Sequence, residues 1–310
     1  MKVGERSKKG GIIAGIVIAL LLIVLAGYAV FGKSWLFYDL SGAAPIERVV
    51  PNIIEGKYGV ISSAGNCIAD RFYPPEGYKR TETAAGSLAE YFREIKLKPY
   101  GSDLHFYDGK LSDTLHSAVF DFDVGNADLQ QCADSIIRVY SEYYYARGEF
   151  DNISFHLTNC EVVCYSDWID GKRLFAAGDF AKMVKAAPKG ESYESFRKYL
   201  AAVMNYAGTK SLYAESVPIS IGEFTVGDIL INPGSPGHVV VAADEAVNED
   251  GERCFLLAQG YMPAQEFHLL VNPLHPDDPW YYESEMTGEI RTSPCTFNQS
   301  SIRRWRNFHE

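Results

Sequence analysis

The sequence predicts an α+β fold in which an antiparallel sheet packs against at least two helices. Apolar residues recur at helical spacing across residues 129–144 and again across residues 196–203. Four apolar segments bounded by turn residues then follow one another, which indicates successive strands. These segments are 228–231, 238–243, 254–259 and 267–271. Helices followed by such a run of strands are typical of an α+β domain with an antiparallel meander.

Cap and stop residues suggest where the two helices begin and end. Asn126 or Asp128 is expected to cap the first helix, which should end near Gly148. Gly208 is expected to end the second helix. With either cap, Cys132 would lie four to six residues inside the first helix.

The N-terminal 56 residues are distinct from the predicted domain at 57–310. A basic tail, residues 1–9, precedes an uncharged apolar run at 10–32 that is long enough to span a bilayer. The basic flank is expected to stay in the cytoplasm. This predicts a single-pass membrane anchor, a linker at 33–56 and an extracytoplasmic main domain. Cleavage of a signal peptide near residues 27–29 is the alternative.

The overall charge and the cysteine content narrow the function classes. The 310-residue chain has a formal net charge of -11, and an acidic surface repels phosphate backbones, so no nucleic-acid partner is expected. An exported domain could oxidise its six cysteines, and Cys160 and Cys164 are close enough in sequence to be bridged.

Metal-ligating residue types also occur in the predicted domain. No cysteine or histidine spacing is typical of structural zinc. His105, His116, Asp121 and Asp123 could be considered as ligands, but alternation along a strand directs the two aspartates away from His116. We therefore predict neither a metal site nor a cofactor.

A cysteine and a histidine could form a nucleophilic pair. A Gly/Pro-rich turn precedes His238, which begins an apolar strand, and Cys132 lies in the first long helix. An imidazole and a helix N-terminus both lower a thiol pKa. Gln259 on the next strand could orient His238, and Gln131 or Gln130 could donate to an oxyanion.

Each of these candidates also has a structural interpretation. Cys132 lies on the apolar stripe of its helix and could be a packed core thiol. Trp280 and Tyr281 could form a stacking platform for a sugar or peptide, or cover an edge of the core. Asp228 is expected to cap a turn, and Asp244 to be a charge at a strand end.

Several motifs in a fixed order resemble the bacterial domain-of-unknown-function 4846 family, from about Arg71 to the C-terminus. They occur at residues 71–78, 96–101, 128–134, 206–209 and 256–265. This resemblance implies an exported bacterial protein and assigns no activity. The stretch 227–244 is similar to the corresponding stretch of papain-like NlpC and CHAP amidases. That similarity implies a papain-like arrangement in which His238 is the base for a cysteine nucleophile.

Two functions follow as hypotheses. The first is a membrane-anchored papain-like cysteine hydrolase, an amidase or peptidase that acts on envelope peptides or peptidoglycan. The alternative is a non-catalytic envelope domain that binds glycan, peptide or a partner protein, with the Trp280 region as its contact surface.

Overall fold

The computed structural model describes residues 60–178 and 180–306. The predicted cytoplasmic tail, membrane anchor and linker lie outside these residues. Within the described part of the chain, no helix combines the length and apolar character needed to cross a membrane.

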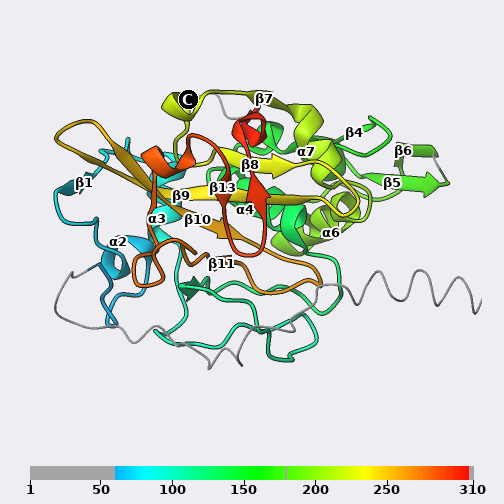
Figure 1. Ribbon diagram of the computed structural model, residues 1–310. Helices are drawn as coiled ribbons and strands as arrows, with labels where there is room; N and C mark the ends of the chain where they lie inside the picture. Colours follow the sequence, from blue (N-terminus) through cyan, green and yellow to red (C-terminus); the bar gives the residue numbers. More distant parts are fainter. Residues whose placement is uncertain (1–59, 179, 307–310) are drawn as a thin grey trace, which may run out of the picture. The chain divides into compact units, whose positions relative to one another are not determined.

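The described residues form short helices and one large sheet (Figure 1). The helices are α2 (Ile68–Arg71), α3 (Leu88–Glu94), α4 (Cys132–Ala146), α5 (Tyr165–Ile169), α6 (Tyr193–Met204) and α7 (Thr209–Glu215).

The large sheet is antiparallel throughout, and its strands follow the order β2, β11, β10, β9, β8, β15, β7. These strands are β2 (Ala118–Val119), β11 (His268–Leu269), β10 (Arg253–Gln259), β9 (His238–Asn248), β8 (Ile229–Asn232), β15 (Ile302–Trp305) and β7 (Ser216–Pro218). Two further strands, β1 (Tyr78–Arg80) and β12 (Tyr281–Tyr282), pair with β9 and β10.

Three separate hairpins complete the strands of the described residues. They are β3 (Ser154–His156) with β4 (Val162–Cys164), β5 (Lys172–Ala177) with β6 (Phe180–Lys185), and β13 (Ile290–Arg291) with β14 (Thr296–Phe297).

The predicted α+β class and antiparallel meander are confirmed. Strands β8 to β11 are consecutive in sequence and adjacent in the sheet. Strand β9 extends beyond its predicted end as far as Asn248. The two predicted helices correspond to α4 and α6, and Ser192 caps α6 by accepting from the Ser195 amide.

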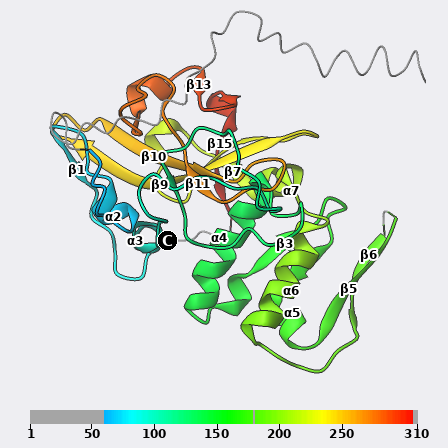
Figure 2. The same ribbon diagram turned by 90° about the horizontal axis from the view of Figure 1, so that it is seen from below.

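The sheet lies between two apolar layers, and β9 is therefore buried on both faces. Val239 and Val241 pack with Ile136 of α4, whereas Val240 and Ala242 belong to a second cluster. Figure 2 shows α4 and α6 on one side of the sheet and β13 on the other. Side chains alternate along a strand, so β9 fixes both layers relative to each other.

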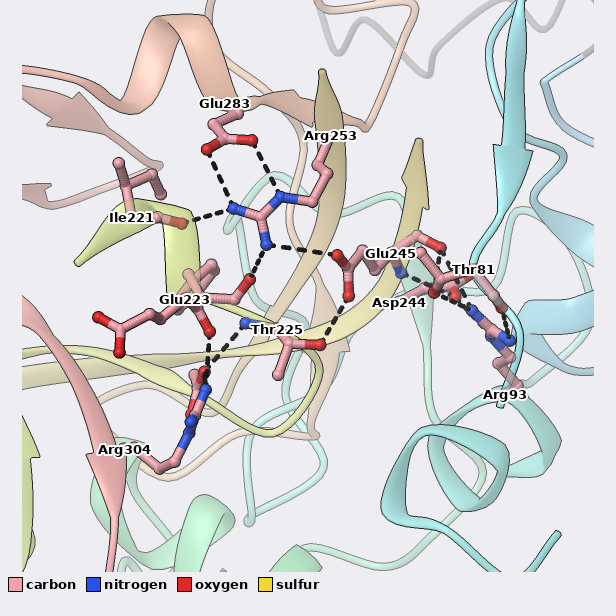
Figure 3. Close-up of polar contacts among 12 residues, drawn as sticks. Thr81, Arg93, Ile221, Glu223, Thr225, Asp244, Glu245, Arg253, Glu283 and Arg304 are labelled. Atoms are coloured by element: carbon pink, nitrogen blue, oxygen red, sulfur yellow. Dashed lines mark hydrogen bonds and ion pairs between the residues drawn. The ribbon is translucent and has the colours of Figure 1, made fainter. Parts of the chain in front are cut away.

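Buried ion pairs connect the sheet to segments that are remote in sequence. Asp244 is fully buried, and its carboxylate accepts from Arg80 at 2.6 Å and Arg93 at 2.7 Å. Figure 3 shows Arg93 between Asp244 and Thr81, and the neighbouring contacts of Arg253. The prediction that Asp244 is a strand-end charge is wrong, because β9 continues past it and both arginines approach its carboxylate.

Asp228 is also a structural residue, as the sequence indicated. Its carboxylate accepts two hydrogen bonds of 2.7 Å from Arg304 and one from the Thr225 amide. Arg304 also donates to the carbonyl of Glu223, which Figure 3 shows beside it. These contacts connect β15, near the C-terminus, to the turn before β8.

We expect Asp244→Ala to lower the free energy of unfolding by about 3–5 kcal/mol, because it leaves two largely buried arginines without their counter-charge. Urea unfolding followed by circular dichroism measures this change. The control is Asp108→Ala, which removes an exposed pair with Lys110 and should leave stability nearly unchanged. Equal midpoints for both variants would contradict the structural role of Asp244.

Candidate active site

Cys132 is the first residue of α4, and Gln131 is its N-cap. The prediction that Asn126 or Asp128 caps this helix is wrong. Asp128 instead accepts from the Ala264 amide at 2.7 Å, so its carboxylate holds a loop after β10. Cys132 therefore lies at the helix N-terminus, where backbone amides stabilise negative charge.

The Cys132 sulfur contacts main-chain atoms of Gly237 and Val239, the two residues that flank His238. It is 3.8 Å from the carbonyl oxygen of Gly237, and the amide of Val239 hydrogen-bonds it. Burial raises the pKa of the Cys132 thiol to about 11, although the Ala133 amide at the helix N-terminus lowers it. The resting side chain is therefore a protonated thiol at neutral pH.

His238 begins β9, and the residue is 5% exposed. Its Nε2 lies 2.7 Å from Oε1 of Gln259, and the rings of Phe297 and Tyr261 contact it at 6.0 and 5.3 Å between centroids. Burial lowers the pKa of His238 to about 4, partly offset by the Gln259 hydrogen bond. Within the described structure, the sulfur bonds to Gly237 and not to the imidazole.

Two glycines allow these segments to approach so closely. A Cβ atom at Gly237 would lie 2.2 Å from Oγ1 of Thr209, and one at Gly260 would lie 2.1 Å from Oγ of Ser135. Gly260 thus lets the first turn of α4 contact the end of β10, and Gly237 lets the loop before His238 contact α7. Larger side chains at either position would push Cys132 and β9 apart.

A pocket of about 290 Å³ opens beside Cys132. The loop 234–237 forms one wall, and Met204 and Met262 contribute apolar side chains. Its polar lining consists of Asp128, Gln131, Asp134, Asn205, Thr209 and Ser235, besides the Cys132 thiol. Two carboxylates and no lysine or arginine line it, so it suits a neutral or cationic group.

The two candidate oxyanion donors differ in position. Gln131 lines the pocket, and its Nε2 donates one hydrogen bond of 2.9 Å to Asp128. Gln130 is buried, and its Oε1 accepts from Arg138. Gln131 and the amide of Cys132 are therefore the candidate oxyanion donors at the pocket, while Nε2 of Gln130 has no hydrogen-bond partner among the described residues.

Asp134, at the third position of α4, is a buried carboxylate that also lines the pocket. Its Oδ2 accepts from the Gln131 amide at 3.1 Å, whereas its Oδ1 has no hydrogen-bond partner among the described residues. Burial raises the pKa of Asp134 to about 7, although the Gln131 amide lowers it. The fold thus places beside the thiol a buried carboxyl group with one oxygen that lacks a hydrogen-bond partner.

Trp280 and Tyr281, the predicted stacking platform, belong to the core. Trp280 is 0% and Tyr281 is 3% exposed, so neither presents a ring to a ligand. The indole donates to the carbonyl of Tyr73 at 3.0 Å, and the phenol donates to that of Val271 at 2.6 Å. The alternative interpretation, in which they cover the core, describes their positions.

The remaining candidates have structural contacts. Asp123 pairs with Arg138 and Arg197, and both His116 ring nitrogens face carbonyl oxygens. Within the described residues, no cluster of three or more histidine, cysteine or acidic side chains is arranged to hold a metal ion. All six cysteines are free, so Cys160 and Cys164 are not bridged.

Sequence reasoning missed Asp134 and His268. The spacing of Gln131 and Asp134 is that of a capping box, which could have revealed the start of α4. His268 pairs directly with Gln259 between β11 and β10, a register that a single sequence does not reveal.

A sequence model of the family described as Domain of unknown function (4846) matches residues 68–304. The chain belongs to this family. The match includes Cys132, His238 and Gln259 of this 4846 domain. No curated protein and no solved structure matches the chain, so these comparisons do not support the papain-like likeness.

Asp134→Asn is expected to stabilise the 4846 domain at pH 8 and not at pH 4. The folded-state pKa of about 7 exceeds the unfolded value of about 3.9. The folded state therefore binds more protons between these values, and wild-type stability falls as pH rises through this window. Three pKa units set an upper limit of about 4 kcal/mol for the gain.

Urea unfolding at both pH values measures this difference. The sign control is Asp123→Asn: Arg197 and Arg138 overcome the effect of burial and lower the pKa of Asp123 to about 2, so this variant should be less stable at pH 8. An Asp134→Asn gain that is equal at pH 4 and pH 8 would show that the carboxylate is not buried in its charged form.

Proposed function

We propose that this protein is a cysteine hydrolase that cleaves amide bonds in the cell envelope. The observation that carries this proposal is the position of Cys132, which begins a helix, lines a pocket and contacts the main chain around His238. The hydrogen bond that Nε2 of His238 donates to Oε1 of Gln259 supports it, because the other ring nitrogen is left to receive a proton.

The reaction would begin with a neutral pair. Burial opposes both a thiolate and an imidazolium, as the pKa values of about 11 and about 4 indicate. The thiol hydrogen would have to leave the Gly237 carbonyl and pass to Nδ1 of His238, whose ring stacks on Phe297 of the second layer, as the sulfur attacks the substrate carbonyl carbon. General-base catalysis of this kind forms the charges only in the transition state.

The first residues of α4 would stabilise the oxyanion. The amide of Cys132 and the second Nε2 hydrogen of Gln131 can donate to the developing negative charge. His238 then returns its proton to the leaving amine, which departs and leaves a thioester on Cys132. A water molecule, deprotonated by His238, hydrolyses the thioester to a carboxylic acid and restores the thiol.

The acidic pocket indicates the kind of group next to the scissile bond. Asp128 and Asp134 would repel a carboxylate and attract an ammonium group. We infer a peptide substrate with a neutral or amine-bearing residue there. The envelope location rests on residues 10–32, which the sequence predicts to be a membrane anchor.

One observation favours a second candidate, a non-catalytic domain that binds peptide in this pocket. The Cys132 hydrogen is engaged by Gly237, and the raised pKa keeps the sulfur protonated. In this case the pocket would bind the same ligands without reacting. The binding surface would be the pocket, since Trp280 is buried.

A peptide vinyl sulfone should label Cys132 of the full-length chain in detergent, because a proton acceptor is needed to generate the thiolate. Mass spectrometry of tryptic peptides measures the rate at each cysteine. We expect His238→Ala to slow the Cys132 adduct by at least about 100-fold. Amide hydrolysis should fall by at least about 1,000-fold in Cys132→Ser.

Two other cysteines provide matched controls. Cys160 is exposed and should label with or without His238, while Cys254 is fully buried and should label only after denaturation. A Cys132 that behaves like Cys254 would refute the hydrolase proposal. Saturable peptide binding by that unreactive protein would then support the second candidate.

A further inference from the structure

Gln259 connects His238 to a second buried histidine. Its Oε1 lies 2.7 Å from Nε2 of His238, and its Nε2 lies 3.1 Å from Nε2 of His268. The same Nε2 donates to the carbonyl oxygen of Ser293 at 3.2 Å. Gln259 and His268 are both 0% exposed, so water does not compete for these contacts.

A backbone carbonyl fixes the tautomer of His268. Its Nδ1 lies 2.9 Å from the carbonyl oxygen of Glu266, which can only accept. Nδ1 must therefore carry a hydrogen. Burial lowers the pKa of His268 to about 3, so the ring is neutral at physiological pH and its Nε2 is a bare acceptor.

The amide of Gln259 can then adopt only one orientation. One hydrogen of its Nε2 is donated to His268 and the other to the carbonyl of Ser293. A flipped amide would direct its oxygen at two acceptors and leave both unpaired, which costs roughly 1–3 kcal/mol for each buried group. Oε1 is thereby directed at His238, and Nε2 of that ring must donate.

We propose that His268 is a positioning residue that acts through Gln259 to hold His238 as the tautomer protonated on Nε2, with Nδ1 free to accept a proton. The catalytic consequence rests on the proposed hydrolase function, in which Nδ1 receives the thiol proton. The tautomer itself follows from the two carbonyl oxygens that end the chain of hydrogen bonds.

Few charges surround this chain of hydrogen bonds. The ring of His116 meets that of His268 at 6.3 Å between centroids, and the Glu266 side chain is directed to Lys98 and His105. On the other side, His238 contacts the Tyr261 ring. None of these groups donates to or accepts from the Gln259 amide.

Nitrogen-15 spectra of the full-length chain, labelled only in histidine, test the proposal directly. His238→Gln identifies the His238 ring signals by their loss. We expect the wild-type protein to show a protonated Nε2 and a bare Nδ1 at pH 7. A protonated Nδ1 would overturn the proposal without reference to any activity.

Substitutions of His268 test its role as the origin of this preference. His268→Phe removes the acceptor and should give a mixture of His238 tautomers. The vinyl sulfone rate at Cys132 should fall by roughly tenfold to a hundredfold, as is typical when an outer partner of a functional histidine is lost. His268→Gln supplies an amide oxygen near the position of Nε2 and should restore most of both signals.

His116→Phe is the control, because it changes a neighbouring ring without touching Gln259; it should leave the His238 tautomer unchanged. An unchanged tautomer in His268→Phe would overturn the positioning role. If the tautomer shifts as expected but wild-type Cys132 takes no adduct, His268 positions His238 and the hydrolase function fails.

Discussion

Burial of β9 on both faces is the constraint on which the rest of the structure depends. Its first nine residues are all buried, with alternate side chains in the α4 layer and in the layer beneath β13 and β14. A strand buried in this way cannot slip by one residue without exchanging the two layers. The positions of His238 at its start and of Asp244 further along are therefore set by the same packing.

Two buried polar residues of β9, Asp244 and His238, have opposite kinds of partner. Asp244 has charged partners, because Arg80 and Arg93 both donate to its carboxylate. His238 has only the neutral amide of Gln259, so desolvation decides its state and leaves the ring uncharged. The ion pairs of Asp244 hold one region of the strand to the fold. The neutral imidazole of His238, at the start of the strand, can still accept a proton.

Periodicity and turn residues allowed much of the fold to be predicted, because β8 to β11 and helices α4 and α6 depend mainly on local patterns. Helix α7 was missed because it has only two turns, and its packing against Gly237 is a tertiary contact. The pairing of β15 with β8 joins segments about 70 residues apart, which no local pattern reveals.

The candidate site also divides into features that local sequence patterns predict and features that depend on tertiary contacts. Cys132, His238 and Gln259 could be selected because each lies at a recognisable point of a helix or strand. The start of α4 was misplaced, because Asp128 is the better cap by residue type until the Ala264 amide occupies it. The burial of Trp280 depends on the carbonyl of Tyr73, which comes from a segment about 200 residues earlier.

Desolvation at the thiol has a further consequence for how such a site could work. Helix N-termini usually favour a thiolate, but here burial and the nearby carboxylate of Asp134 oppose it. An ammonium group of a ligand in the pocket would pair with the carboxylate of Asp134. The resulting neutral pair would no longer repel the thiolate that develops on Cys132. Substrate binding would then lower the barrier to proton transfer from Cys132, so the site would react fastest with a peptide that carries an ammonium group.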